Sequence, residues 1–298
     1  MTSALGIDGG GRATRWVLAD AAGAVLARGE APPLSGLIFC DAAIGSARAA
    51  VAALADATGA HGGIGAVLAG VTGTSDGSPQ NALLRNMLAE ALRVPQERVR
   101  VHDDLWLAHR ARFAPGTGIL VYCGTGSAAV HVRADGALIR AGGHGYLIDD
   151  GGSGYAIARD AVRAVLEAED AEPGSGWQTP LGCSLARLIG GDTWEAVRAY
   201  VYGGTRASMA ALGPAVAEAA RADDPAASGV LRRAGRDLAA VARVVAGRIG
   251  AQPFALAGGG ATLHPLIHAA MEQALGSPVD MAACDAAAAA ARIALHEI

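Results

Sequence analysis

The sequence has no lysine, and this absence excludes several kinds of chemistry. All 24 basic residues among the 298 are arginine. A Walker-type phosphate loop, a Schiff-base enzyme and the strand lysine of protein kinases each need a lysine side chain, so these mechanisms are excluded. We interpret the excess of arginine as compositional bias, because alanine and glycine are inflated together with it.

Cysteines and long apolar runs are also scarce. The four cysteines stand at positions 40, 123, 183 and 284, and none has the C-x-x-C spacing of a zinc site or a redox pair. The first residues lack the basic and apolar regions of a signal peptide. An apolar run of about 18 residues, which a membrane span needs, is not found without glycine or charge. We therefore expect a soluble protein in the reducing cytoplasm, with no membrane partner.

Charge and composition limit the function further. The formal net charge is -4, so the basic footprint of a nucleic-acid-binding protein is missing. Hydrophobic residues make up 52% of the chain although aromatics make up only 4%, which argues against a disordered acidic chain. A chain of 298 residues predicts two domains or one large one.

Hydrophobic patterning predicts an α/β protein with an internal duplication. The first half reads as strands and helices in the order strand 4–8, strand 16–19, strand 25–28, helix 42–57, strand 64–71, helix 81–93, strand 99–102 and helix 105–113. The pattern then restarts with strands 118–123, 128–132 and 137–140, a mostly helical region 154–250, strand 254–257, a helix from 263 and a helix 285–295. Each half opens with hairpins and a glycine turn, which indicates the duplication.

Three glycine-rich turns are candidates for phosphate binding. They lie in the segments IDGGGRATR, CGTGSA and LAGGGAT, and each follows an apolar strand. Glycine lets the backbone approach a ligand closely and aims N–H groups at it, which suits phosphate. None has the G-x-G-x-x-G spacing that opens a helix, so a dinucleotide-binding fold is disfavoured. The candidate residues are Gly9, Gly10, Gly11, Gly124, Thr125, Gly126, Gly258, Gly259 and Gly260.

Acidic residues accompany these turns. Asp8 ends the first strand, where it is interpreted as a Mg²⁺ ligand beside phosphates or as a hydrogen-bonded turn residue. Asp103 and Asp104 stand between a strand and a helix, where one can cap the helix and the other can act as general base or metal ligand. Asp150 lies in the acidic loop DDGGSG, which is interpreted either as a helix cap or as a polar wall of a substrate pocket.

In this order, the motifs resemble the actin/hexokinase/Hsp70-type ATPases, and among them the N-acetylglucosamine kinase branch of the BadF/BadG/BcrA/BcrD ATPase family. The segments VHDDLWLAH, GTGS and AGGHGYLIDDGGSGYAI carry the resemblance, which covers nearly the whole chain. It implies an actin-like (ribonuclease H-like) α/β fold, with two duplicated domains around a nucleotide cleft. Residues 1–112 would form the first domain, with the closing helix 285–298 packing back on it. Residues 113–284 would form the second, with a helical insertion at about 154–250.

The resemblance also implies an activity and a set of site residues. The expected reaction is ATP-dependent phosphorylation of an amino sugar, N-acetylglucosamine first, at its 6-hydroxyl, by a homodimer. Asp104 would be the general base and Asp8 would hold Mg²⁺ through water. The glycine turns and Arg12 would bind the nucleotide. The sugar would be bound by Ser35, Asp104, Ser127, Gly143, His144 and Asp150.

Departures from the family pattern leave the substrate open. Arg12 takes a threonine position, so a hydroxyl contact to phosphate is lost and a charge is gained. Ser35 stands where many members have asparagine, His144 stands for a tryptophan, and Gly151 stands for a glutamate. A histidine between glycines is interpreted equally well as exposed or as a donor to a sugar hydroxyl.

Three alternative functions remain at this stage. Glucosamine or another hexose is an alternative acceptor. The family also includes ATPase activators of 2-hydroxyacyl-CoA dehydratases and benzoyl-CoA reductases, which hold an iron–sulfur cluster at a dimer interface. The scattered cysteines indicate that this chain carries no such cluster. A non-catalytic sugar-binding regulator is the third alternative, and the presence of both Asp8 and Asp104 argues against it.

Overall fold

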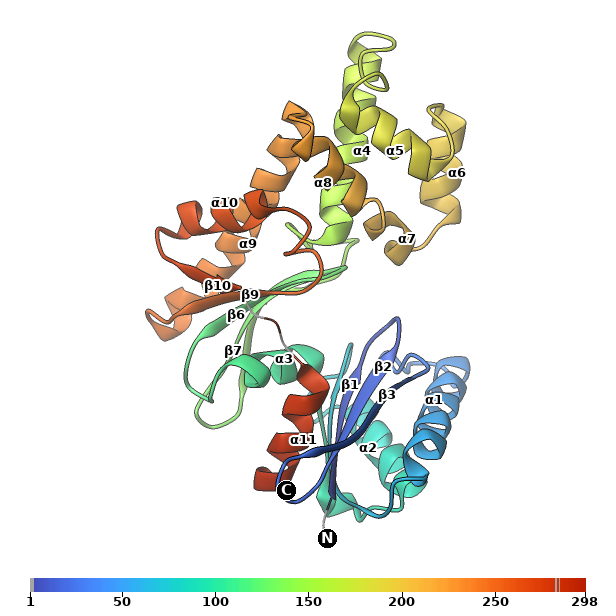
Figure 1. Ribbon diagram of the computed structural model, residues 1–298, viewed down its shortest axis with the longest axis vertical. Coiled ribbons are helices and arrows are strands. Elements are labelled where there is room, and N and C mark those ends of the chain that lie inside the picture. Colours follow the sequence, from blue (N-terminus) through green and yellow to red (C-terminus); the bar gives the residue numbers. More distant parts are fainter. Residues whose placement is uncertain (1–2, 282, 284) are drawn as a thin grey trace. The chain divides into compact units, whose positions relative to one another are not determined.

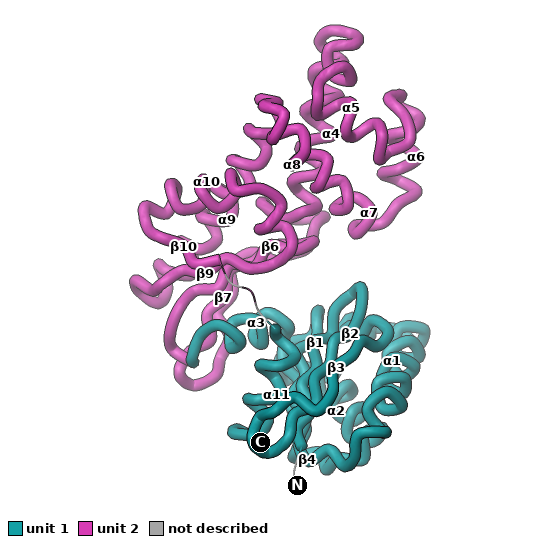
Figure 2. The backbone as a smooth tube through the Cα atoms, viewed as in Figure 1, with its two compact units in different colours: residues 1–114, 284–298 teal, residues 115–283 magenta. Residues whose placement is uncertain are grey.

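The computed structural model describes residues 3–281, 283 and 285–298. The chain splits into two compact units, shown in different colours in Figure 2. The first unit comprises residues 1–114 and 284–298, and the second comprises residues 115–283. Each unit has its own five-stranded mixed sheet and its own core.

The first unit is built on a sheet with the strand order β3-β2-β1-β4-β5. Strands β1 and β2, and β2 and β3, pair antiparallel as hairpins, whereas β4 and β5 run parallel to β1. The strands are β1 (Ser3–Gly9), β2 (Thr14–Ala19), β3 (Val25–Ala31), β4 (Ile64–Val71) and β5 (Val99–Asp103). The helices are α1 (Asp41–Gly59), α2 (Pro79–Leu92), η1 (Gln96–Arg98), α3 (Asp104–Arg112) and α11 (Ala286–Glu297).

Helix α11 returns from the far end of the sequence to pack on this first sheet (Figure 1). Its alanines Ala287, Ala288 and Ala291 are buried against Val17 and Ala19 of β2. Alanine side chains are short, so the helix backbone approaches β1 closely. The first unit is therefore assembled from both ends of the chain.

The second unit repeats the topology of the first. Its sheet has the order β10-β9-β6-β7-β8, with antiparallel hairpins β6–β7–β8 and parallel strands β6, β9 and β10. The strands are β6 (Ile119–Cys123), β7 (Ser127–Val132), β8 (Leu138–Gly142), β9 (Phe254–Ala257) and β10 (Val279–Met281). The predicted duplication is thereby confirmed.

Helices inserted after β8 make up most of the rest of the second unit. They are α4 (Gly154–Ala171), α5 (Pro180–Ile189), α6 (Trp194–Gly203), α7 (Arg206–Ala210), α8 (Gly213–Arg221) and α9 (Pro225–Ile249), and α10 (Pro265–Leu275) follows β9. Helices α5, α8, α9 and α10 each start with a proline in the first turn, where its missing N–H costs nothing. The predicted helical region 154–250 is confirmed.

Two details of the second unit differ from the sequence-based expectation. The helix expected from 263 begins at Pro265, because the His264 side chain caps it by accepting from the Leu266 N–H at 3.2 Å. Strand β10 was not predicted, because its three residues are too few to show an alternating pattern.

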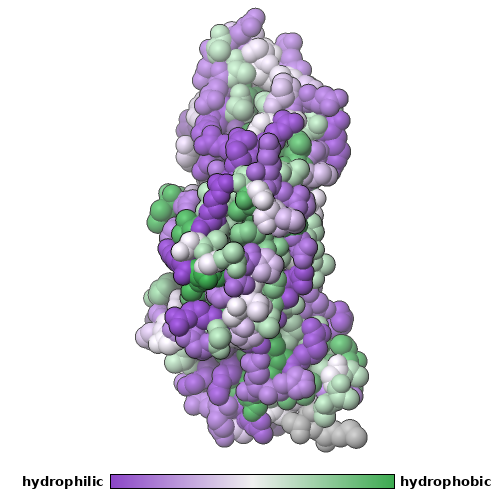
Figure 3. All heavy atoms as spheres, turned by 90° about the vertical axis from the view of Figure 1, so that its left-hand side faces the viewer, coloured by the Kyte–Doolittle hydropathy of each residue, from purple (hydrophilic) through white to green (hydrophobic). Residues whose placement is uncertain are grey.

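The surface mixes polar and apolar residues. Figure 3 shows hydrophilic residues spread over the face it draws, with smaller apolar areas between them. None of the helices in the described part of the chain combines the length and the apolar character that a membrane crossing requires.

Candidate functional site

The carboxyl ends of three parallel strands bring acidic and hydroxyl groups together in the first unit. Asp8 lies near the end of β1 and is paired with Gly70 of β4. Thr72 follows β4, and its backbone N–H donates to the Gly9 carbonyl at 2.9 Å. Asp104 follows β5 directly. Parallel strands of an open sheet place ligands at this edge, so it is the candidate site of this unit.

The neighbours Asp103 and Asp104 make different contacts. Asp103 is the N-cap of α3, and its carboxylate accepts from the Leu105 N–H at 2.8 Å. Asp104 is the first helical residue and accepts from the same N–H at 3.0 Å. Its carboxylate also accepts a hydrogen bond from the Thr72 side chain. The helix cap therefore falls to Asp103, while Asp104 belongs to the edge formed by β1 and β4.

The electrostatic surroundings of Asp104 suit a proton acceptor. Burial, followed by the charge of Asp103, raises the pKa of Asp104 to about 7, and the Asp8 charge contributes in the same direction. A group with a pKa near the working pH is both substantially ionised and basic enough to take a proton. Sequence reasoning missed Thr72, because a single threonine after a strand carries no motif.

Asp8 is half-buried, with 25% of its side chain exposed and Arg15 at 3.6 Å. Burial raises its pKa, and the guanidinium of Arg15 opposes that rise. Among residues 3–281, 283 and 285–298, no group of three or more His, Cys, Asp or Glu side chains is arranged to hold a metal ion. A Mg²⁺ at Asp8 would therefore take most of its ligands from phosphate and water, as Mg²⁺ commonly does.

The first glycine turn and Ser35 lie in the same unit. Gly10 donates its N–H to the Ala13 carbonyl at 3.1 Å, which leaves Gly11 and Arg12 exposed in the turn. Ser35 is half-buried, and its hydroxyl oxygen accepts from the Leu37 N–H at 3.2 Å.

The other two glycine turns meet at Cys123 in the second unit. The Gly124 N–H donates to the Gly126 carbonyl at 2.8 Å, and the Gly260 N–H donates to the Cys123 carbonyl at 2.8 Å. Gly258 has a φ of +101°, and a Cβ there would overlap the Cys123 backbone. Glycine is thus required where these turns approach each other.

Cys123 is buried beneath these turns. Its thiol donates to the Gly152 carbonyl at 3.2 Å, and burial raises its pKa to about 12. A thiol with so high a pKa is a poor metal ligand. Cys123 belongs to the hydrophobic core of the second unit. Cys40 and Cys183 are exposed, and Cys284 lies outside the described residues.

The acidic loop 149–152 lies under the second glycine turn. Ser127 donates its hydroxyl to the Gly151 carbonyl at 2.7 Å and its N–H to Asp150 at 3.4 Å. Asp150 is only 2% exposed, and it pairs with Arg206 at 3.2 Å. Burial raises the pKa of Asp150, while the Ser127 N–H and Arg206 oppose the rise. Arg206 was missed from the sequence, because it stands far along the chain in a segment with no recognisable motif.

His144 lies away from these buried contacts. Its side chain is 60% exposed, and its Nδ1 is 3.4 Å from Asp149 Oδ2. The preceding Gly143 has a φ of +69°. The structure therefore gathers Ser127, Asp150 and two glycine turns in one unit, and Asp8, Asp104 and Ser35 in the other.

Strand-end carboxylates in one unit and glycine turns in its structural repeat define an ATPase of the actin-like fold. The profile of the BadF/BadG/BcrA/BcrD ATPase family matches residues 5–288, and the chain belongs to this family. No match to the chain was found among curated proteins.

Solved structures of similar fold cover nearly the whole chain. A candidate N-acetylglucosamine kinase from Chromobacterium violaceum is 27% identical with a TM-score of 0.77, over 99% of each chain. A candidate N-acetylglucosamine kinase from Porphyromonas gingivalis is 19% identical with a TM-score of 0.78, over 100% of each chain. A ROK family glucokinase from Streptomyces griseus, in complex with glucose and AMPPNP, is 20% identical with a TM-score of 0.58, over 98% of each chain.

Proposed function

We propose that this protein is an ATP-dependent sugar kinase that phosphorylates an amino sugar, with N-acetylglucosamine as first candidate and its 6-hydroxyl as acceptor. One observation carries the proposal. Asp104 combines a pKa of about 7 with a position at the strand edge, where it accepts a hydrogen bond from the Thr72 side chain and Asp103 serves as the N-cap of α3. A proton acceptor placed in this way is what transfer to an alcohol needs.

Asp104 would take the proton of the acceptor hydroxyl while the hydroxyl oxygen attacks the terminal phosphorus of ATP. The bond from that phosphorus to the bridging oxygen breaks, and ADP leaves. Such transfer depends mainly on positioning and charge stabilisation, which those N–H groups of the glycine turns that do not bond to protein carbonyls would supply at the phosphates. Mg²⁺ bound through water at Asp8 would neutralise phosphate charge.

The choice of sugar rests on the two candidate N-acetylglucosamine kinases of similar structure. We propose that the sugar is contacted by Ser35, Ser127, Gly143, His144 and Asp150. The exposure of His144 leaves it able to donate to a sugar hydroxyl. Glucosamine or another hexose is the alternative acceptor, and a cytoplasmic homodimer remains the proposed state.

Release of ADP should be measured with N-acetylglucosamine, glucosamine, N-acetylmannosamine and glucose as acceptors, with and without Mg²⁺. We expect Mg²⁺-dependent release that requires a sugar and is fastest with N-acetylglucosamine. Release at the same rate without any sugar would contradict the kinase assignment. Release that is fastest with glucosamine or glucose would move the proposal to that acceptor.

A further inference from the structure

Arg206 lies directly against the second glycine turn. The structure leaves just enough room for it, because a Cβ on Gly126 would collide with Arg206 Nη2 and lie 3.0 Å from a carboxylate oxygen of Asp150. Arg206 is the first residue of α7, far from the turn in sequence. Because Gly126 has no side chain, the Arg206 guanidinium can lie against the turn, and the backbone of the turn stays accessible.

The guanidinium is held in place on two sides. Nη2 donates to Asp150 at 3.2 Å, and the guanidinium carbon lies 5.7 Å from the centre of the Tyr146 ring. Its Nε is buried without a hydrogen-bond partner in the described part of the chain. The side chain is nevertheless 38% exposed, so it keeps donors for a ligand.

The arrangement around Arg206 carries costs in stability that a purely structural contact would avoid. Asp150 is buried and has a φ of +94°, in the region that disfavours residues with a side chain. An ion pair with a buried carboxylate adds little stability compared with a well-packed neutral pair. The pair instead keeps a positive group preorganised beside a turn whose geometry suits phosphate.

We propose that Arg206 is a phosphate-binding residue, which donates to the phosphate chain of the nucleotide held at the Gly124–Gly126 turn. The inference rests on the proposed use of ATP. In a chain without lysine, a permanent positive charge has to come from arginine. Asp150 and Tyr146 position the guanidinium, and the nucleotide supplies the acceptors for its remaining N–H groups.

Calorimetric titration with ATP, ADP and adenosine tests the assignment without any turnover. The Arg206→Ala variant loses charged hydrogen bonds to phosphate. Its affinity for ATP and ADP should therefore fall about tenfold to a hundredfold, while its affinity for adenosine should not change. Arg206→Lys should bind both nucleotides with intermediate affinity, because one ammonium cannot serve Asp150 and phosphate with the geometry of a guanidinium. Unchanged ATP and ADP affinities in Arg206→Ala would overturn the assignment.

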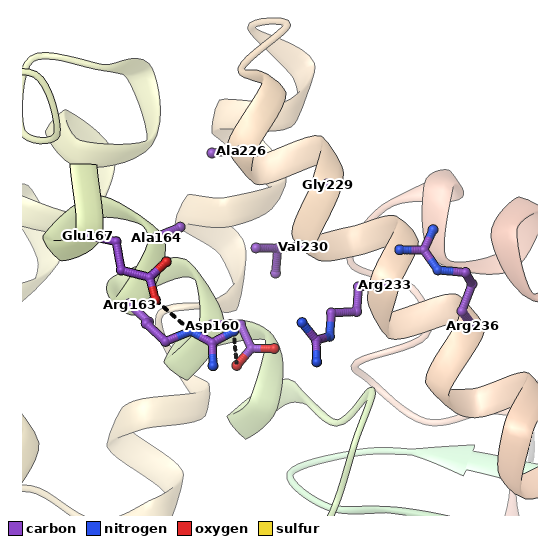
Figure 4. Close-up of a pocket in the computed structure, with 9 residues that line it drawn as sticks. All are labelled: Asp160, Arg163, Ala164, Glu167, Ala226, Gly229, Val230, Arg233 and Arg236. Atoms are coloured by element: carbon purple, nitrogen blue, oxygen red, sulfur yellow. Dashed lines mark ion pairs between the residues drawn. The ribbon is translucent and has the colours of Figure 1, made fainter. Parts of the chain in front are cut away.

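Arg163 offers a matched control in the same unit. It is 51% exposed and pairs with the buried Asp160 at 3.7 Å and with Glu167 at 3.6 Å. Figure 4 shows these pairs. They lie at a hollow of about 260 Å³ that is lined by residues of α4 and α9. Arg163→Ala should leave nucleotide affinity unchanged. If Arg163→Ala and Arg206→Ala lost nucleotide affinity equally, the loss would come from the change in net charge alone, and the assignment would be overturned.

A double variant, Arg206→Ala with Asp150→Asn, tests whether Arg206 binds phosphate or only neutralises the charge of Asp150. If Arg206 served only to neutralise the buried carboxylate, Asp150→Asn would restore nucleotide affinity to Arg206→Ala. We expect the double variant to melt normally and still bind ATP and ADP weakly. Restored affinity would overturn the phosphate contact. Absence of ATP and ADP binding in the unmodified protein would instead remove the proposed function, and this assignment with it.

Discussion

At the scale of the residue, two adjacent carboxylates show how position divides roles. Asp103 ends β5 and has the dihedral angles and contact of an N-cap, whereas the next residue, Asp104, begins α3 and contacts Thr72. The acidic pair at a strand-to-helix junction predicted one cap and one functional acid. The full surroundings of Asp104 were not predictable, because Asp8, whose charge raises the pKa of Asp104, and Thr72, whose hydrogen bond lowers it, are brought to Asp104 only by the sheet.

Replacing Asp104 by asparagine should abolish most of the activity. Asp104→Asn keeps the shape and removes the basicity, so kcat should fall by roughly 10²–10⁴-fold while ATP affinity changes little. Asp103→Asn keeps a capping oxygen and should have a much milder effect. Steady-state kinetics with the best sugar and nucleotide titrations measure both variants. A dead Asp103→Asn and an active Asp104→Asn would reverse the assignment.

The same substitution should change how stability depends on pH. The pKa of Asp104 is 3.8 when unperturbed and about 7 in the fold, so the native state holds the proton more tightly than the unfolded state. The resulting stabilisation is present below pH 4 and is lost as the pH rises to about 7. In urea unfolding, the free energy of unfolding of Asp104→Asn relative to that of the unmodified protein should rise over this pH range and stay constant above it. A gap that does not vary with pH would contradict the raised pKa.

At the scale of the element, the contact between α11 and β1 depends on a residue without a side chain. A Cβ on Gly6 would overlap the Ala287 carbonyl and the Ala291 nitrogen. Both belong to the backbone of α11, which cannot move aside as a flexible side chain can. The small residues of the two elements therefore set how closely they pack.

Gly6→Ala should destabilise the protein by about 1–3 kcal/mol, because it overpacks this contact. Gly45 is a matched control within α1, since a Cβ there meets nothing within 4 Å. Gly45→Ala should stabilise by about 0.5–1 kcal/mol through helix propensity. Denaturant unfolding of both variants measures these changes. Equal effects at the two positions would show that α11 is not closely packed on β1.

Local patterns predicted most helices and strands but few of the contacts between them. Strand β4 was predicted at its observed bounds because a buried parallel strand is a continuous apolar run. Arg206 was missed because its partner, Asp150, is brought to it by the folding of the helical insertion. Long-range pairs of this kind leave no spacing in the sequence.

At the scale of the whole molecule, the two units repeat one topology but differ in continuity. The second unit is one continuous segment, residues 115–283, whereas the first combines residues 1–114 with 284–298. The first sheet is therefore covered on one face by a helix encoded at the other end of the chain.

Expression of separate segments should reveal this difference. Residues 115–283 alone should fold and melt cooperatively, because they contain a complete core. Residues 1–114 alone should not, because β1 and β2 lose the alanines of α11. Joining 284–298 to 1–114 through a flexible linker should restore cooperative melting by circular dichroism. A stable 1–114 segment without α11 would contradict this dependence.

The late position of α11 in the chain also orders the folding of the newly made protein. Domains tend to fold as units while the ribosome is still translating. The second unit is complete once residue 283 has emerged, whereas the first must await the last helix although its strands are made earliest. During synthesis the face of the first sheet that α11 will cover, which is lined by alanine and valine, is exposed to other chains. Association with other chains through this face therefore ends only when α11 has been made and has packed on the sheet.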